Sequence, residues 1–197
     1  MKKLVLLMTL FCLLPLSASA FSDVHEEDWF YTHVMQFSQA GIIDGYADGS
    51  FRPEEEITNA AFVKLLVIAV GGEKLQAEGH WAQGYVDAAE AMGIVLEDEI
   101  PLGEYDEPIR RQRIARFTAR ALWHVRQEES PRENVENPGL SDWTTICSIC
   151  KNEVAALYNR GIMRGYPDGK FYGVGHATRA EAVTVLARLI HPHLRLK

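Results

Sequence analysis

The spacing of apolar side chains along the chain predicts pairs of helices separated by loops. Near the start, apolar residues recur every three or four positions, the pattern of a helix with one buried stripe. Asp28 is a candidate N-cap for this helix, and Gly41 is placed to end it. A second helix is predicted to open at Ile57-Thr58 and end at Gly71-Gly72, apolar around so much of its surface that neighbours must cover it. The stripe of the first helix comprises Trp29, Phe30, Val34, Phe37 and Ala40.

This helix–loop–helix pattern occurs three times. The loop GIIDGYADGSF (residues 41–51) returns 120 positions later as GIMRGYPDGKF (residues 161–171), and the register continues into the following helix. A fainter copy lies at an offset of 52, which aligns Trp29 with Trp81, but its loop EDEIPLGEYDEP has lost the glycine signal. One unit alone is not expected to bury its apolar faces, so the pattern predicts an all-α domain of three stacked units.

The chain divides accordingly. Lys2 and Lys3, an apolar run over residues 4–16 and the small residues 18–20 are typical of a secretory signal peptide, and the run is too short to be a transmembrane helix. The expected segments are a signal peptide (1–20), repeat 1 (21–72), repeat 2 with a degenerate loop (73–126), a linker (127–139), repeat 3 (140–191) and a C-terminal tail (192–197).

Charge and cysteine content narrow the function classes. Loss of Lys2 and Lys3 with the signal peptide takes the formal net charge from −7 to −9, which argues against binding nucleic acid through bulk charge. No long apolar segment remains, so we expect no membrane insertion after cleavage. Cys147 and Cys150 are then the only cysteines, and they form either a local disulfide or two free thiols. A zinc site would need two more ligands, for which His176, His191 or His193 are speculative, and no cofactor is expected.

The motifs FSDVHEEDW, GIIDGYADGSFRP, ITNAAF, GIMRGYPDGKF and ATRAEA resemble the S-layer homology (SLH) repeat over residues 21–191. The resemblance implies three tandem repeats that form a pseudo-threefold, three-lobed helical domain. It also implies noncovalent attachment to secondary cell-wall polysaccharide, often carrying acidic pyruvate ketals, in grooves between neighbouring repeats. The protein is therefore expected to be secreted and associated with the bacterial cell wall or S-layer.

In this family the Arg of T-R-A-E is a principal ligand contact, helped by the glycine-rich loop and the Trp near the first helix. The chemistry suits the role, because Thr178 and Glu181 form a capping box that presents Arg179 at a helix N-terminus, where backbone N–H groups also favour anions. The alternative is that Thr178 and Glu181 form only a cap and Arg179 is a solvated charge. The implied polymer-binding residues are Arg179, Arg111, Thr178, Trp29, Trp81, Asp48, Gly49, Asp168 and Gly169.

The units depart from the family pattern at several points. Asn59 replaces the Arg in repeat 1 and Ala61 replaces the Glu, so a site built on Asn59 should be weak or absent. In repeat 2 the cationic run 110–113, with Arg116 beyond it, needs nearby anions. Either the acids of residues 97–107 or an acidic polymer could supply them.

The tryptophans have two interpretations. Trp29 and Trp81 belong either to the core, as their place in an apolar stripe favours, or to a groove edge where they stack on sugar rings. In repeat 3, Ile149 takes the aligned position and Trp143 is displaced upstream.

The loop also allows a metal interpretation, which the sequence disfavours. Asp44, Asp48, Gly49 and Glu55 fall on four positions of a calcium loop, but Tyr46 occupies a required ligand position. The third copy also lacks two of these ligands. We therefore expect a structural loop, in which Asp48 and Asp168 brace the turn.

Two rival functions remain to be separated from polymer binding. The scaffold could bind another envelope protein or support S-layer assembly, which the loss of Arg at Asn59 would allow. An enzyme is not expected, because the adjacent acids Glu54, Glu55 and Glu56 do not provide two carboxylates across a cleft.

Overall fold

The computed structural model describes residues 21–76, 79–129 and 135–197. The predicted signal peptide, and part of the linker predicted for residues 127–139, lie outside these ranges. The described part is all-α, as predicted, and contains no β-strand. The helices are α1 (Tyr31–Gln39), α2 (Asn59–Ala69), α3 (Gln83–Ala91), α4 (Arg111–Arg120), which continues as a π-helical turn (Ala121–Val125), α5 (Lys151–Asn159) and α6 (Arg179–Ile190).

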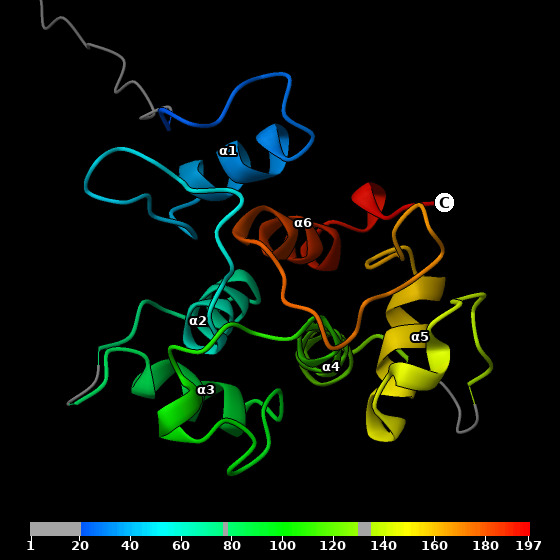
Figure 1. Cartoon of the computed structure of the whole chain (residues 1–197). Helices are drawn as coiled ribbons and strands as arrows, with labels where there is room; N and C mark the ends of the chain where they lie inside the picture. Colours follow the sequence, from blue (N-terminus) through cyan, green and yellow to red (C-terminus); the bar gives the residue numbers. More distant parts are fainter. Residues whose placement is uncertain (1–20, 77–78, 130–134) are drawn as a thin grey trace, which may run out of the picture.

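The second helix of each unit lies at the centre, and the first helix lies outside. In Figure 1, α2, α4 and α6 surround the middle of the molecule, while α1, α3 and α5 occupy three outer corners. Each outer helix packs on the central helix of a different unit: α3 on α2, α5 on α4, and α1 on α6. Every lobe is therefore made by two units, which explains why one apolar helix pair needs its neighbours.

Backbone hydrogen bonds close the three units into a ring. Isolated antiparallel bridges pair Glu56 with Thr178, Thr58 with Pro108, and Arg110 with His176. The first N–H of each central helix continues the pattern and donates to a carbonyl in the loop of another unit. These bonds run from Arg179 to Glu55 (2.9 Å), from Asn59 to Glu107 (3.0 Å) and from Arg111 to Gly175 (2.9 Å). The middle unit takes its place in this ring although its loop sequence has degenerated.

The ends of the first helix only partly follow the prediction. Gly41 ends α1 with a φ of 67°, as expected for a left-handed C-terminal glycine. Asp28 is not its N-cap: α1 begins later, at Tyr31, and the Asp28 carboxylate accepts a hydrogen bond from the His25 N–H at 2.8 Å. Turns occupy the residues between, so Trp29 precedes the helix rather than lying on its buried stripe.

Candidate functional site: grooves between the units

The glycine-rich loops are held by an aspartate from the start of the same unit. The Asp23 carboxylate accepts from the backbone N–H groups of Phe51 (2.7 Å) and Arg52 (2.8 Å). In the third unit, Asp142 accepts in the same way from Phe171 and Tyr172, both at 2.8 Å. No role was predicted for Asp23 and Asp142, although their recurrence in FSDV and LSDW was a usable signal.

Asp48 and Asp168 brace the loop turns, as predicted. Asp48 accepts from the Ser50 backbone and hydroxyl groups (3.0 and 2.6 Å), and these bonds, with Arg52, lower its pKa to about 2. Asp168 accepts from the Lys170 N–H at 3.1 Å and from the Tyr172 hydroxyl. Gly49 and Gly169 adopt φ values of 80° and 79° at the turn tips. These four residues shape the loop but line neither of the grooves described below.

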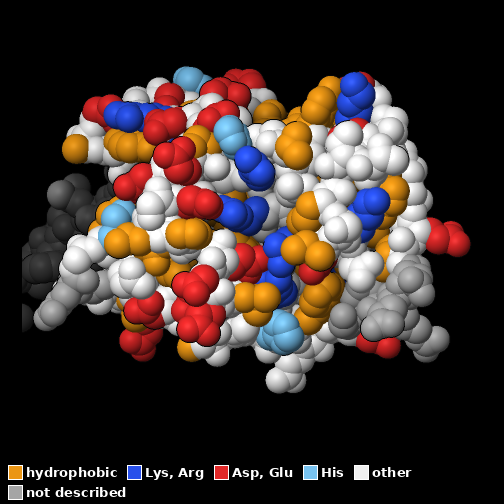
Figure 2. Space-filling model, turned by 60° about the horizontal axis from the view of Figure 1, so that its bottom comes forward, with side chains coloured by type: hydrophobic (Ala, Val, Ile, Leu, Met, Phe, Trp, Pro, Cys, Tyr) orange, Lys and Arg blue, Asp and Glu red, His pale blue; other side chains and the backbone are white. Residues whose placement is uncertain are grey.

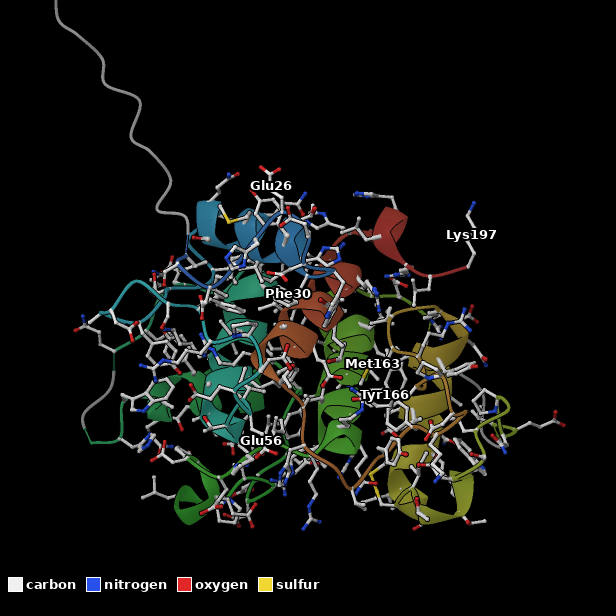
Figure 3. The ribbon with its side chains drawn as sticks, turned by 45° about the horizontal axis from the view of Figure 1, so that its top comes forward. Glu26, Phe30, Glu56, Met163, Tyr166 and Lys197 are labelled. Carbon is white, nitrogen blue, oxygen red and sulfur yellow. A yellow bond between two sulfur atoms is a disulfide. The ribbon has the colours of Figure 1, made fainter. Side chains whose placement is uncertain are left out.

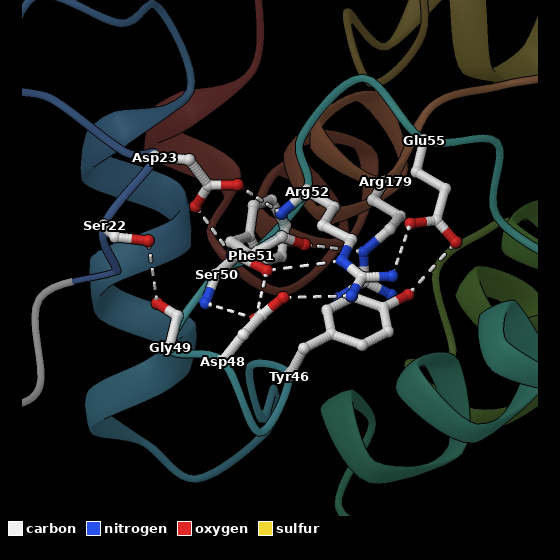
Figure 4. Close-up of polar contacts among 10 residues, drawn as sticks. All are labelled: Ser22, Asp23, Tyr46, Asp48, Gly49, Ser50, Phe51, Arg52, Glu55 and Arg179. Carbon is white, nitrogen blue, oxygen red and sulfur yellow. Dashed lines mark hydrogen bonds and ion pairs between the residues drawn. The ribbon is translucent and has the colours of Figure 1, made fainter.

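Arg179 extends from the start of α6 into the loop of the first unit (Figure 4). Its Nε donates to the Phe51 carbonyl at 2.8 Å, and its guanidinium lies 5.0 Å from the Tyr46 ring centre and 4.9 Å from that of Phe51. Burial lowers the pKa of this guanidinium, which nevertheless stays charged at any physiological pH. The capping box predicted at its helix start is confirmed, with Thr178 accepting from the Glu181 N–H and Glu181 from the Thr178 N–H.

Arg111 makes the equivalent approach from α4 into the loop of the third unit. Its Nε donates to the Phe171 carbonyl at 3.0 Å, and its guanidinium lies 4.6 Å from the centre of the Tyr166 ring. It is more buried than Arg179 and also donates to the Arg164 carbonyl at 3.3 Å. The second and third units thus each present an arginine to the loop of another unit in the same way.

Each arginine lies in a groove whose edge carries an exposed tryptophan. The Trp29 groove, about 210 Å³, and the Trp81 groove, about 230 Å³, each combine a loop, a central helix, an arginine and a tryptophan drawn from three units. Trp29 is 61% exposed and Trp81 is 47% exposed, so the core interpretation of these residues is wrong. The Trp29 groove is lined by Trp29, Arg111, Met163, Arg164, Gly165, Tyr166, Glu181, Thr184, Val185, Arg188 and Leu196, of which Met163 and Tyr166 are labelled in Figure 3. The Trp81 groove is lined by Ile43, Asp44, Gly45, Tyr46, Ala61, Lys64, Leu65, Trp81 and Arg179.

The two grooves differ in how their arginine is neutralised. In the Trp29 groove, Glu181 lies 3.4 Å from Arg111 and accepts a 2.5 Å hydrogen bond from the Tyr166 hydroxyl. Burial, together with this bond, raises the pKa of Tyr166 to about 12. The equivalent position in the Trp81 groove is Ala61, and among the described residues no carboxylate lies within 4 Å of the Arg179 guanidinium. Arg179 is therefore the cation better placed to accept an external anion.

At the third junction a polar groove of about 300 Å³ is present, but contacts within the protein engage the side chains that line it. Asn59 is 1% exposed; its amide nitrogen donates to the carbonyls of Glu104 and Glu107 at 3.0 Å, and its oxygen accepts from Arg113 at 2.9 Å. Arg113 also pairs with Glu104 at 2.9 Å, while Arg116 pairs with Glu99 at 2.8 Å. For these arginines the internal acids are the counter-charges. Figure 2 shows a face where basic side chains form a band beside an area rich in acidic ones.

The remaining candidates are structural features in the described part of the chain. Cys147 and Cys150 form a disulfide at the start of α5, and the nearby Ile149 is 67% exposed at the position that Trp29 and Trp81 hold in the other units. Within the described ranges, no cluster of three or more His, Cys, Asp or Glu side chains is arranged to hold a metal ion. The described helices also include none that is long and apolar enough to span a membrane.

Two segments of the chain match the S-layer homology domain family. They cover residues 20–63 and 140–183, which include the loops and helix starts of the first and third units. The SLH resemblance is thereby confirmed for these two units, and both the Arg179 side chain and the loop that holds it come from SLH segments.

Several curated proteins share this region. An endoglucanase of Bacillus sp. (strain KSM-635) is 27% identical over 88% of this chain and 19% of its own length. A cellulosome-anchoring protein of Acetivibrio thermocellus is 31% identical over 58% of this chain and 27% of its own. A surface layer protein of Brevibacillus choshinensis is 30% identical over 39% of this chain and 7% of its own. The chain thus matches about a quarter or less of the length of each of these relatives.

Proposed function

We propose that this protein is a non-catalytic cell-envelope module made of three tandem SLH repeats. It attaches noncovalently to an acidic, pyruvylated secondary cell-wall polysaccharide through the Trp81 and Trp29 grooves. The cyclic backbone bonding supports counting the middle unit as a repeat, since it gives and receives the same helix-start contacts as the two matched units.

The environment of Arg179 is the observation that carries this proposal. The Phe51 carbonyl and two aromatic rings fix the guanidinium by its Nε side, which leaves its terminal nitrogens for a carboxylate. The arginine lies in a groove edged by Trp81, whose exposed ring offers a stacking surface for a sugar. A pyruvate ketal combines these two chemistries, because it is a carboxylate attached directly to a sugar ring.

The Trp29 groove is the second polymer site in this proposal. Arg111 is held by the equivalent carbonyl bond, but Glu181 already neutralises part of its charge. The junction at Asn59 is not a polymer site, because its polar groups bond one another. Two of the three junctions therefore bind polymer, and the Trp81 groove contributes more affinity.

The protein functions outside the cell, at the bacterial cell wall. Relatives named as a cellulosome-anchoring protein and a surface layer protein support a role in surface attachment. The match to an endoglucanase does not argue for catalysis, since it covers only 19% of that enzyme.

Co-sedimentation with peptidoglycan sacculi tests the proposal. Wild-type protein should sediment with sacculi that carry their secondary polymer and stay in solution with sacculi stripped of it. Arg179→Ala and Arg111→Ala should each weaken binding by about 1.5–3 kcal/mol where a charge-assisted contact is lost. The effect of Arg111→Ala should fall at the lower end of this range, because Glu181 shields that cation.

Arg126→Ala is the matched control, because it removes a positive charge outside both grooves. If this variant lost as much binding as Arg179→Ala, attraction by net charge would explain the data instead of groove recognition. Folded wild-type protein that ignored polymer-bearing sacculi from its own source would overturn the proposal and direct the search to envelope proteins as partners.

A further inference from the structure

Besides Arg111, which pairs with Glu181, the Trp29 groove contains two more arginines. Arg164, from the loop of the third unit, and Arg188, from α6, both line it. The corresponding positions in the Trp81 groove, 120 residues earlier, are Asp44 and Ile68. This pair of cations therefore belongs to one groove only.

These two guanidinium groups lack a counter-charge within the described part of the chain. No carboxylate there lies within 4 Å of either group, and the Nε atoms of both are buried without a hydrogen-bond partner. Their hydrogen bonds are long: Arg164 donates to the Leu196 carbonyl at 3.4 Å and Arg188 to the Ile162 carbonyl at 3.5 Å. The Arg164 guanidinium also lies 4.8 Å from the centre of the Tyr158 ring, a contact that supplies no negative charge. Burial, followed by the charge of Arg164, lowers the pKa of Arg188, as expected for like charges close together.

Nearby groups do not supply the missing negative charge. His33 contributes none, and burial, followed by the charge of Arg188, lowers its pKa. Glu181 is the only carboxylate that lines the described groove, and it is already engaged by Arg111 and Tyr166. Two positive charges in a partly buried groove are unfavourable unless an anion binds to both of them.

We propose that Arg164 and Arg188 form an anion subsite for a phosphate group, next to the Arg111 contact. This inference rests on the proposed function, in that the groove is taken to hold a polymer. Two guanidinium groups suit a tetrahedral phosphate, which offers several acceptor oxygens and up to two negative charges. The Trp29 groove therefore takes a phosphorylated portion of the ligand, whereas the Trp81 groove takes a simple carboxylate.

Arginine Nε–H resonances in ¹⁵N-labelled protein report on this subsite directly. Inorganic phosphate, titrated at constant ionic strength with sodium chloride, should shift the Arg164 and Arg188 signals saturably and leave that of Arg126 unchanged. Arg164→Gln and Arg188→Gln should each weaken phosphate affinity by about tenfold or more, as for loss of a charge-assisted contact. Arg126→Gln, which removes a positive charge outside both grooves, should leave it unchanged.

Glucose 6-phosphate distinguishes the source of the group. Affinity equal to or above that of inorganic phosphate indicates a sugar-borne phosphate with room for the ring beside Trp29, and lower affinity indicates a site for the free ion. Linear, unsaturable shifts that are the same at all arginines would overturn the subsite. Arg164→Gln leaves α6 intact, so it keeps the test valid if Arg188→Gln fails to fold.

The outcome is separable from that of the proposed function. Protein that binds sacculi but shows no saturable phosphate shift refutes only this subsite. Protein that binds phosphate through Arg164 and Arg188 but ignores sacculi refutes only polymer attachment.

Discussion

Ala61→Glu should make the protein more stable and its polymer binding weaker. Thr58 already caps α2, because its hydroxyl accepts a hydrogen bond from the Ala61 N–H at 3.2 Å. The methyl side chain of Ala61 cannot accept a hydrogen bond from the Thr58 N–H in return. A glutamate there would complete the capping box that Thr178 and Glu181 form in α6. A reciprocal cap and an acid in the first helical turn together should add about 0.5–1 kcal/mol to the free energy of unfolding.

The same glutamate would place a carboxylate beside Arg179. By analogy with Glu181, which lies 3.4 Å from Arg111, it would partly neutralise the guanidinium and repel an incoming anion. Two unit charges about 4 Å apart interact by roughly 4 kcal/mol at an effective dielectric of about 20, while exposed pairs measure below about 1 kcal/mol. We therefore expect a loss of about 1–2 kcal/mol, or roughly 5- to 30-fold in affinity.

Urea unfolding and sacculus co-sedimentation measure the two effects separately. Ala61→Gln is the control, since glutamine can complete the cap without the charge. It should gain stability while keeping more affinity than Ala61→Glu. If Ala61→Glu bound polymer as tightly as wild type, the reasoning that Arg179 acts as an un-neutralised cation would be refuted.

Three further predictions concern the described contacts. Asn59→Ala should lower the free energy of unfolding by about 1–3 kcal/mol, because it leaves buried polar groups without partners. Polymer binding should stay at the wild-type level. Asn152→Ala, at an exposed position, is the control, and an unchanged urea midpoint for Asn59→Ala would contradict the prediction. Asp142→Ala should speed hydrogen exchange at the Phe171 and Tyr172 amides, because it removes the carboxylate that accepts from both. Wild-type protection of these two amides in the variant would contradict this prediction. The pKa of Asp48, followed by carboxyl NMR, should be about 2. Its stabilising effect should therefore be present above the ordinary pKa near 3.8 and be lost as the pH falls through about 2. Ser50→Ala should raise this pKa, and a wild-type pKa near 3.8 would contradict the bracing role.

The sequence repeats predicted the fold class, the starts of α2 and α6 and the arginine positions, but not which loop each arginine contacts. Alignment of the repeats shows which residues are equivalent, but it does not show which units are in contact. Arg179 contacts a loop more than 120 residues away in the sequence. For this reason Ala61 was predicted to weaken a site built on Asn59. In the structure, Ala61 instead lines the Trp81 groove together with Arg179.

The predicted burial of Trp29 and Trp81 was wrong for a reason that lies in the local structure. Their spacing fits a helical stripe, but Trp29 lies in turns before α1 begins, where helical periodicity does not apply. The roles of Asp23 and Asp142 also depend on contacts between distant residues, because each carboxylate holds two amides about 29 positions away.

The cyclic pairing of units explains how the chain can lose parts of two repeats and keep two grooves in which an arginine meets a glycine-rich loop. Each groove needs an arginine from one unit and a loop from another. The first unit has lost its arginine at Asn59, and the second has lost its glycine-rich loop. Because Asn59 faces the loop of the second unit, both losses fall at the same junction. The loop of the first unit still receives Arg179 and the second unit still supplies Arg111, so two degenerate repeats remove one arginine-to-loop contact rather than two.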